Sequence, residues 1–233
     1  MPNRPLLLGH RGARAVKSVP ENTLASFDFA LSTFCHGFEL DVRLSVDGQA
    51  VLSHDPRIHG LEISQSSVRK LRLPSLQQVV ARYQSTAFLD IELKVAGLEA
   101  ATVDMLRAAP PARGLVVSSF LPEVIEKIRD IDAGIPLGLI CETARQLKRF
   151  AGVSAEYGIF HHRLVKKELI ERMKSEGKKV FVWTVNSPTD MKRFARWGVD
   201  GIISDDPRVL ALTLRPELTF GAKTAQTRKG RHS

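Results

Sequence analysis

The sequence is poor in the features that mark secreted, membrane and nucleotide-binding proteins. Only two of its 233 residues are cysteines, Cys35 and Cys141, so we expect no disulfide framework and a reducing, cytoplasmic location. It has no run of about 18 apolar residues, and its first residues lack the apolar core of a signal peptide, roughly 7–15 residues long. No transmembrane segment is therefore predicted. Neither a P-loop nor a glycine-rich dinucleotide-binding turn is present, so no nucleotide cofactor is implied.

Acidic residues are absent from residues 222–233, although the chain as a whole is basic. This segment supplies four of the nine net positive charges, from Lys223, Arg228, Lys229 and Arg231. We expect residues 214–233 to form a basic, disordered tail and residues 1–213 to form one domain. The remaining charge is moderate, so no nucleic-acid partner is expected. A moderately basic domain suits an anionic small-molecule substrate, and nothing in the sequence predicts an oligomeric state.

Short apolar runs alternate with amphipathic segments along the whole chain. The apolar runs predict strands at residues 5–9, 37–43, 88–93, 115–119, 137–141, 157–161, 179–184 and 201–204. The amphipathic segments predict helices at 22–34, 75–83, 98–108, 122–131, 144–150, 166–176, 187–198 and from 206 onward. Such alternation implies parallel strands with helical crossovers. Eight pairs in one chain of this length predict a single-domain α/β fold, a (β/α)8 TIM barrel, rather than an open doubly wound sheet.

A turn signal, Asp47-Gly48, follows the second predicted strand and precedes the short run VLSH. A two-residue turn at this point predicts a short β-hairpin extension after that strand. In that register Asp41 lies opposite His54, and Glu39 shares their face. A slip of one residue would separate the three side chains, so this inference depends on the turn.

Acidic side chains collect on two of the predicted strands. Glu39 and Asp41 on the second strand and Glu92 on the third share the parity of inward-facing residues, and barrel sites lie at the C-terminal ends of strands. Three carboxylates in one barrel mouth raise one another's pKa values, and a bound divalent cation relieves that repulsion. Oxygen ligands favour Mg²⁺ or Ca²⁺, with Mn²⁺ also suitable, over zinc. The alternative is that these acids form salt bridges with Arg11, Arg43 and Lys94.

Two histidines accompany these acids, His10 at the end of the first strand and His54 on the hairpin. Imidazole titrates near neutral pH, so both are candidates for proton transfer. Arg11 and Lys94 are cations beside the same site, and their natural ligand is an anionic group such as a phosphate. The residues alone therefore indicate metal-assisted chemistry on a phosphate ester.

At these residues the chain resembles the glycerophosphodiester phosphodiesterase family, from about Leu6 to Arg208. The resemblance depends on an ordered set of motifs: GHRGA, PENTLASF, FELDVRLSVDGQAVLSHDP, DIELK, VSSF, VFVWTVN and GVDGIISDDP. Single motifs such as HRG or ELD would mean little, but the ordered set is specific. The fold that the resemblance implies is a TIM barrel, in agreement with the strand count.

The resemblance also implies roles for individual residues. Glu39, Asp41 and Glu92 would bind one Mg²⁺ or Ca²⁺ ion, and His10 and His54 would form the general acid/base pair. Arg11 and Lys94 would hold the phosphate of a small-molecule phosphodiester.

Two further residues take roles only through the resemblance. Trp183 would form an aromatic wall of the substrate pocket, with ordinary core packing as the alternative. Glu21 would brace His10 or Arg11, with helix capping as the alternative.

The implied reaction is hydrolysis of a glycerophosphodiester to glycerol 3-phosphate and an alcohol. The glycerol 2-hydroxyl would attack phosphorus and form a cyclic phosphate that water then opens. Of the two histidines, His10 is favoured as the base and His54 as the acid.

One departure from the family pattern leaves other functions open. Residues 56–74 are shorter than the usual inserted cap and lack its Arg-Thr-Thr and Gly pattern. A smaller cap predicts a more open pocket, so lysophospholipase D activity, or hydrolysis of another small phosphodiester, is an alternative. A catalytically inactive barrel that acts as a binding module is a second alternative.

Overall fold

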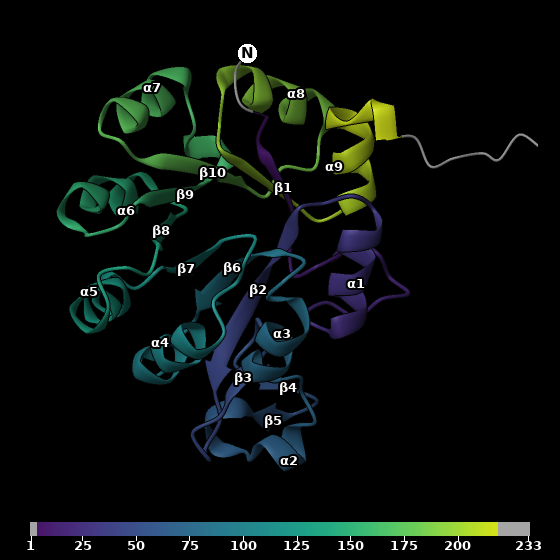
Figure 1. Ribbon diagram of the computed structural model, residues 1–233, viewed down its shortest axis with the longest axis vertical. Coiled ribbons are helices and arrows are strands. Elements are labelled where there is room, and N and C mark those ends of the chain that lie inside the picture. The colour runs from purple at the N-terminus through teal and green to yellow at the C-terminus, as the bar shows by residue number, and fades with distance from the viewer. Residues whose placement is uncertain (1–3, 219–233) are drawn as a thin grey trace, which may run out of the picture.

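The computed structural model describes residues 4–218, whose strands close into a parallel barrel (Figure 1). Its eight strands are β1 (Leu6–Gly9), β2 (Gly37–Leu44), β6 (Phe88–Leu93), β7 (Leu115–Ser119), β8 (Leu137–Cys141), β9 (Tyr157–His161), β10 (Lys179–Trp183) and β11 (Gly201–Ser204). Each strand pairs with the next one in the barrel, and the pairing of β1 with β2 closes the ring. The predicted TIM barrel is confirmed.

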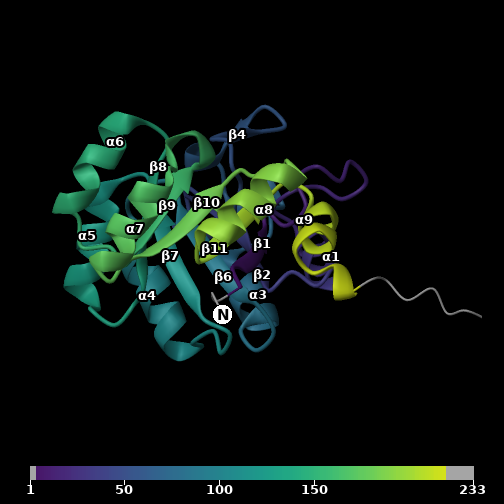
Figure 2. The same ribbon diagram turned by 90° about the horizontal axis from the view of Figure 1, so that it is seen from above.

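Helices follow the barrel strands and surround the sheet (Figures 1 and 2). They are α1 (Leu24–Ser32), α3 (Leu76–Tyr83), α4 (Glu99–Ala108), α5 (Pro122–Ile131), α6 (Ala144–Arg149), α7 (Lys167–Ser175), α8 (Pro188–Trp197) and α9 (Pro207–Leu214). Thr23 caps α1, because its side chain accepts a hydrogen bond from the Ser26 amide at 3.2 Å. Asn22 has a positive φ of 55° and is free to serve the site described below.

Alternation along β2 separates the core from the site. Phe38, Leu40 and Val42 face the helices and belong to the main hydrophobic cluster, where Phe38 stacks on Phe27 with ring centroids 4.1 Å apart. Burying each side chain of this size contributes about 1.5–3 kcal/mol. The residues between them point into the barrel, because successive strand side chains alternate. The outward side chains of β2 therefore pack in the hydrophobic core between sheet and helices, and its inward side chains, which include Glu39 and Asp41, line the barrel interior.

The predicted hairpin forms, but its register differs by one residue from the prediction. Strand β3 (Ala50–Leu52) runs antiparallel to β2 with Val42 opposite Leu52, so Asp41 faces Ser53 and not His54. The loop has three residues, 46–48, and Gly48 adopts a φ of 74° that suits the last position of such a loop. The predicted pairing of Asp41 with His54 across the hairpin is therefore wrong. His54 lies beyond the end of β3, outside the paired strands.

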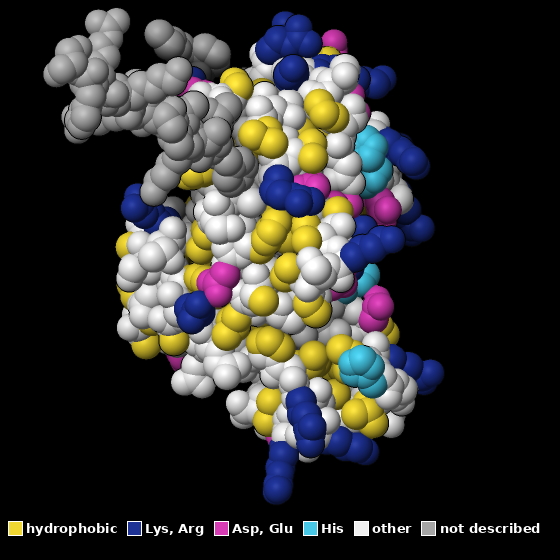
Figure 3. Space-filling view, turned by 90° about the vertical axis from the view of Figure 1, so that its right-hand side faces the viewer, with side chains coloured by type: hydrophobic (Ala, Val, Ile, Leu, Met, Phe, Trp, Pro, Cys, Tyr) yellow, Lys and Arg dark blue, Asp and Glu magenta, His cyan; other side chains and the backbone are white. Residues whose placement is uncertain are grey.

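The segment after His54 forms a small cap of its own. It contains β4 (Arg57–Ile58), β5 (Leu61–Glu62), a 3-10 turn (Ile63–Gln65) and α2 (Val68–Leu71). Ile63 and Leu71 pack against Val51 of β3 in a separate hydrophobic cluster. The cap lies at the lower end of the molecule in Figure 1, and basic side chains project from the same end in Figure 3.

The predicted boundary after residue 213 falls in the last turn of α9. A 3-10 turn (Pro216–Leu218) follows, and an ion pair between Arg4 and Glu217 joins the two ends of the described chain. The rest of the predicted tail, residues 219–233, lies outside the described residues. Within residues 4–218, every helix is too short or too polar to cross a lipid bilayer.

Candidate active site

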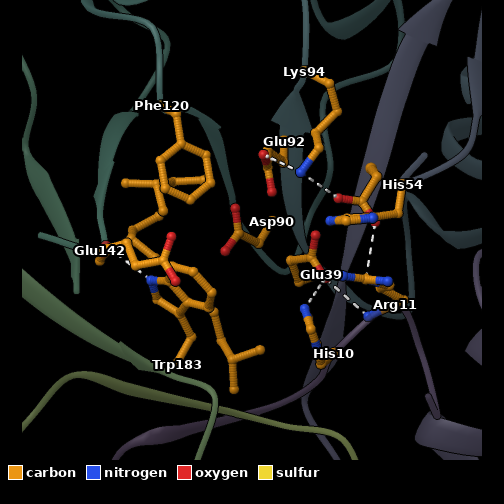
Figure 4. Close-up of a pocket in the computed structure, with 14 residues that line it drawn as sticks. His10, Arg11, Glu39, His54, Asp90, Glu92, Lys94, Phe120, Glu142 and Trp183 are labelled. Atoms are coloured by element: carbon orange, nitrogen blue, oxygen red, sulfur yellow. Dashed lines mark hydrogen bonds and ion pairs between the residues drawn. The ribbon is translucent and has the colours of Figure 1, made fainter. Parts of the chain in front are cut away.

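A pocket of about 260 Å³ opens at the C-terminal ends of the barrel strands (Figure 4). One side of the pocket, the polar half, is lined by His10, Arg11, Glu39, Asp41, His54, Asp90, Glu92 and Lys94. The other side, the apolar half, is lined by Phe120, Ile140, Ile159, Trp183 and Ile203, with Glu142 beside them. The sequence-predicted residues thus come together in one cavity, except Glu21, which contacts it through Arg11.

Three carboxylates converge in the polar half. The parallel register of β2 and β6 sets Asp41 beside Glu92, and Glu39 lies two residues before Asp41. One oxygen from each of the three carboxylates lies within 4.8 Å of the others, and all three residues are buried. Asn22 orients Asp41 from both sides: its amide nitrogen donates to Oδ2 at 2.8 Å, and its oxygen accepts from the Asp41 amide at 3.1 Å.

Burial and mutual repulsion oppose the charging of these acids. Burial, followed by the charges of Asp41 and Glu92, raises the pKa of Glu39 well above its ordinary value. Burial and the Asp41 charge raise the pKa of Glu92 to about 7. Burial also acts on Asp41, but Lys94 and Arg11 outweigh it, so the pKa of Asp41 lies below its ordinary value. The polar half therefore holds more negative charge than its own cations stabilise.

The predicted salt bridges form in part. Lys94 Nζ lies 2.7 Å from Glu92 Oε1 and 3.1 Å from Asp41 Oδ1, and Arg11 Nε lies 3.3 Å from Asp41 Oδ2. Arg43 forms no salt bridge with these acids within the described residues, and its guanidinium instead donates to the His54 carbonyl at 2.7 and 2.9 Å.

Glu39 is the one carboxylate of the three that forms no salt bridge with Lys94 or Arg11. Among residues 4–218 it has no lysine or arginine side chain at ion-pair distance, and only the Arg11 backbone amide donates to its Oε2, at 2.9 Å. Its other oxygen, Oε1, is buried without a hydrogen-bond partner. A buried carboxylate oxygen with no donor is costly, and a cation shared with Asp41 and Glu92 would satisfy it. The three residues therefore fit an oxygen-ligated divalent ion.

In both predicted histidines, Nδ1 lies at hydrogen-bond distance from an aspartate carboxylate. His10 Nδ1 lies 2.6 Å from Asp205 Oδ1, and His54 Nδ1 lies 2.7 Å from Asp55 Oδ1. A carboxylate at Nδ1 fixes the proton there and leaves Nε2 for chemistry. His10 Nε2 lies 3.8 Å from Glu39 Oε2, at the edge of the acidic cluster.

Asp205 is a site residue that the sequence reasoning missed. Burial raises its pKa, but the hydrogen bond and charge of His10 outweigh burial and lower the pKa to about 2. Asn186 Nδ2 donates to the second oxygen of Asp205 at 2.7 Å, and Arg14 Nη1 lies 3.4 Å from it. Asp205 follows the last strand, and its position at a strand end was the available signal.

Asn22 and Asp90 were also missed. Asn22 holds Asp41 by two hydrogen bonds. Asp90 has the inward parity of Glu92 and lines the pocket, and burial raises its pKa to about 7 against the hydrogen bond that Ser118 donates at 2.6 Å.

The remaining two predicted residues have defined contacts. Glu21 accepts a hydrogen bond from Arg11 Nη1 at 2.8 Å, and in the described chain it has no contact with His10. Trp183 lines the apolar half, and its indole N–H donates to the Ile159 carbonyl at 3.2 Å.

The raised pKa of Glu92 predicts a pH-dependent stability for the protein without bound metal. Glu92 titrates near 4.5 when unfolded and near 7 when folded, so between these values the folded state binds more protons. Glu92 should therefore lower the free energy of unfolding by roughly 3 kcal/mol as pH rises from 4.5 to 7, and Glu39 and Asp90, whose pKa values burial also raises, act in the same direction. Urea unfolding in chelator at pH 5 and 7.5 measures this fall, and Glu92→Gln should reduce it. Equal pH dependence in both proteins would contradict the assignment.

Comparison with known proteins gives one consistent result. A sequence model of the glycerophosphoryl diester phosphodiesterase family matches residues 10–107 and 98–209. A glycerophosphodiester phosphodiesterase of Caldanaerobacter subterraneus is 28% identical in an alignment that covers 91% of this chain and 98% of that protein. The Bacillus subtilis enzyme of the same name is 23% identical, over 88% of this chain and 85% of its own length.

Solved structures share the fold. A glycerophosphodiester phosphodiesterase from Thermotoga maritima superimposes with a TM-score of 0.77 at 25% identity, covering 90% of this chain and 98% of its own. An Oleispira antarctica phosphodiesterase in complex with the product sn-glycerol-3-phosphate gives a TM-score of 0.79 at 24% identity, covering 90% and 96%.

Proposed function

The chain belongs to the glycerophosphoryl diester phosphodiesterase family, and we propose that it hydrolyses glycerophosphodiesters to glycerol 3-phosphate and an alcohol with one divalent cation. The observation that carries this proposal is the convergence of three buried carboxylates between two carboxylate-bound imidazoles. The product is the one that the Oleispira antarctica phosphodiesterase binds. The same convergence argues against the alternative of an inactive binding module.

Glu39, Asp41 and Glu92 are the proposed ligands of the cation. Their oxygen donors suit Mg²⁺ or Ca²⁺, and Mn²⁺ also accepts such a set. When bound, the ion supplies a Lewis acid that polarises a phosphoryl oxygen and eases deprotonation of a nearby hydroxyl.

Proton transfer falls to the two histidines. His10 is the proposed base, because Asp205 holds its Nδ1 and leaves Nε2 to take a proton from the attacking hydroxyl. His54 is the proposed acid and would deliver a proton from Nε2 to the departing alcohol. Burial lowers the pKa of His54 against the raising effect of Asp41, and a lower pKa makes its charged form a stronger proton donor.

The two basic side chains of the polar half are the proposed ligands of the substrate phosphate. Arg11 donates from Nη1 to Glu21, and its Nε forms an ion pair with Asp41 at 3.3 Å without a hydrogen bond, so Nη2 remains for a phosphate oxygen. Lys94 has two carboxylate neighbours and three ammonium protons, so one donor remains as well.

A substrate panel with and without EDTA tests the proposal. The panel contains glycerophosphocholine, glycerophosphoethanolamine, glycerophosphoinositol and lysophosphatidylcholine. We expect release of glycerol 3-phosphate from at least one diester, loss of activity with chelator, and recovery with Mg²⁺ or Ca²⁺. No turnover of any substrate, or turnover that EDTA does not affect, would refute the proposal.

A second candidate function, lysophospholipase D activity, is favoured by the apolar half of the pocket. Its five apolar side chains offer a surface for part of a larger lipid substrate. Faster release of lysophosphatidate from lysophosphatidylcholine than of glycerol 3-phosphate from the diesters would identify this activity.

The contact between Asp205 and His10 predicts a positioning role for Asp205. Asp205→Asn should lower kcat about 10–10²-fold, because the carboxylate no longer fixes the imidazole. KM should change much less than kcat, because Asp205 does not line the pocket. Steady-state kinetics measure both constants. A variant that loses stability but keeps the wild-type kcat would show a purely structural role.

A further inference from the structure

The pocket has a polar half and an apolar half, and one carboxylate, that of Glu142, lies in the apolar half. In that place it would repel a substrate that carries only negative charge. The polar half carries the proposed metal ligands, phosphate donors and histidines. Glu142, at the end of β8, lies in the apolar half beside Trp183 and across the cavity from Arg11 (Figure 4). A phosphodiester carries a negative charge, so a carboxylate in this place repels the substrate unless the substrate also carries a positive charge.

The Glu142 carboxylate is not used by the fold. Within residues 4–218 it makes no hydrogen bond or ion pair, whereas the backbone amide of the same residue binds the Gln146 side chain at 2.9 Å. In Figure 4 the carboxylate is directed into the cavity. Its charge acts on His161, whose pKa it raises against the lowering effect of burial. A carboxylate that forms no hydrogen bond or ion pair and faces a cavity is available to a ligand.

Two aromatic rings stand beside this carboxylate. Phe120 and Trp183 meet edge to face, with centroids 5.7 Å apart and ring planes at 82°. The indole is held in place by its bond to the Ile159 carbonyl. Lys94 already lies 5.7 Å from the Phe120 centroid, but no lysine or arginine of the described chain lies over Trp183. Tryptophan attracts a cation more strongly than any other aromatic side chain, and the other ring beside Trp183 is that of His161, with centroids 5.3 Å apart and ring planes at 86°.

We propose that Glu142, Trp183 and Phe120 form a head-group subsite for an organic cation, which selects diesters whose alcohol carries a quaternary ammonium. The inference depends on the proposed function, because it names the substrate class of the same pocket. The diester phosphate binds in the polar half, and the cationic head group binds in the apolar half.

The apolar half favours a quaternary over a primary ammonium. A primary ammonium has three N–H groups that need acceptors or water, and placing it against apolar side chains removes water from those groups at a cost in free energy. Besides the Glu142 carboxylate, the side chains of this half offer no free acceptor, because they are Phe120, Ile140, Ile159, Ile203 and the indole of Trp183. Methyl groups on nitrogen pack against such side chains without needing hydrogen bonds. Glycerophosphocholine should therefore be preferred over glycerophosphoethanolamine and over glycerophosphoinositol.

The test compares kcat/KM for glycerophosphocholine and glycerophosphoinositol in the wild type, Glu142→Gln and Glu142→Lys. The ratio of the two values should fall about 10-fold in Glu142→Gln, chiefly through KM for the choline diester. Glu142→Lys should lower the ratio further and favour glycerophosphoserine. Glu123→Gln, at an exposed position of α5, is the matched control and should keep the wild-type ratio.

An unchanged ratio in Glu142→Gln, with all substrates still hydrolysed, would overturn the subsite and leave the proposed function intact. An equal loss with every diester would also overturn it, because it would show that Glu142 binds the shared glycerol group. Hydrolysis of none of the substrates by the wild type would refute the proposed function instead. As a second measurement, choline should inhibit at least about 10-fold more strongly than its uncharged analogue 3,3-dimethylbutan-1-ol. Equal inhibition by the two compounds would count against a cation site.

Discussion

Replacing His10 by alanine should lower kcat on a glycerophosphodiester at least about 10²-fold, and His54→Ala should do the same. Each imidazole has its Nδ1 on a carboxylate and its other nitrogen available, so each variant removes one proton-transfer group. Binding groups such as Arg11 and Lys94 remain, so KM should change much less than kcat. Steady-state kinetics with a saturating divalent cation measure both constants.

His59→Ala provides the matched control for these variants. His59 lies exposed in the cap, outside the pocket, so its removal should leave kcat within about twofold of the wild type. Full activity of a His10→Ala/His54→Ala double variant would refute the acid/base assignment.

Replacing Glu39 by glutamine should lower kcat about 10³-fold, equivalent to a loss of about 4 kcal/mol of transition-state stabilisation. Glu39 is the carboxylate that the local cations leave unpaired, so its charge is the one most available to a divalent ion. Glutamine keeps the size of the side chain and removes the charge. Activity should be measured at rising Mg²⁺ and Ca²⁺ concentrations, since a weakened site requires more metal for the activity that remains.

Measuring the urea concentration at which Glu39→Gln unfolds distinguishes loss of a metal ligand from misfolding of the variant. Without metal, Glu39→Gln should unfold at the same or a higher urea concentration than the wild type, because it removes a buried, repelled carboxylate whose pKa is raised. Glu123→Gln, far from the pocket, is the control for loss of an acidic side chain. Wild-type activity in Glu39→Gln would exclude this residue as a metal ligand.

The barrel was predictable because its signals are local and repeated. Each strand is a short apolar run next to an amphipathic helix, and eight such pairs leave few arrangements besides a closed barrel. The inward parity of Glu39, Asp41 and Glu92 followed from strand alternation, which holds once the strands are located.

The hairpin register was not predictable from the Asp-Gly pair. Both two- and three-residue loops use glycine with a positive φ, and the choice between them moves every facing residue by one. Side-chain contacts favour the longer loop, because Asp47 accepts hydrogen bonds from the Ser45 hydroxyl within the hairpin and from the Val68 amide of the cap. His54 enters the pocket although the predicted pairing was wrong, because it lies beyond the paired strand.

The supporting residues of the site were not predictable for a related reason. Asn22 and Asp205 lie in loops that follow other elements, and their chemistry depends on which side chain is opposite them in the folded chain. An asparagine just before a predicted helix looks the same in the sequence whether its side chain caps that helix or hydrogen-bonds a carboxylate elsewhere in the fold. Only the closed barrel brings Asp205, at the last strand, to His10, at the first.

Calorimetric titration of the metal-free protein with Mg²⁺, and separately with Ca²⁺ and Mn²⁺, tests the central claim most directly. We expect one ion to bind per chain, and Glu39→Gln to abolish or strongly weaken that binding while the fold is kept. Absence of binding to the wild type by all three ions, or equal binding to Glu39→Gln, would contradict the account.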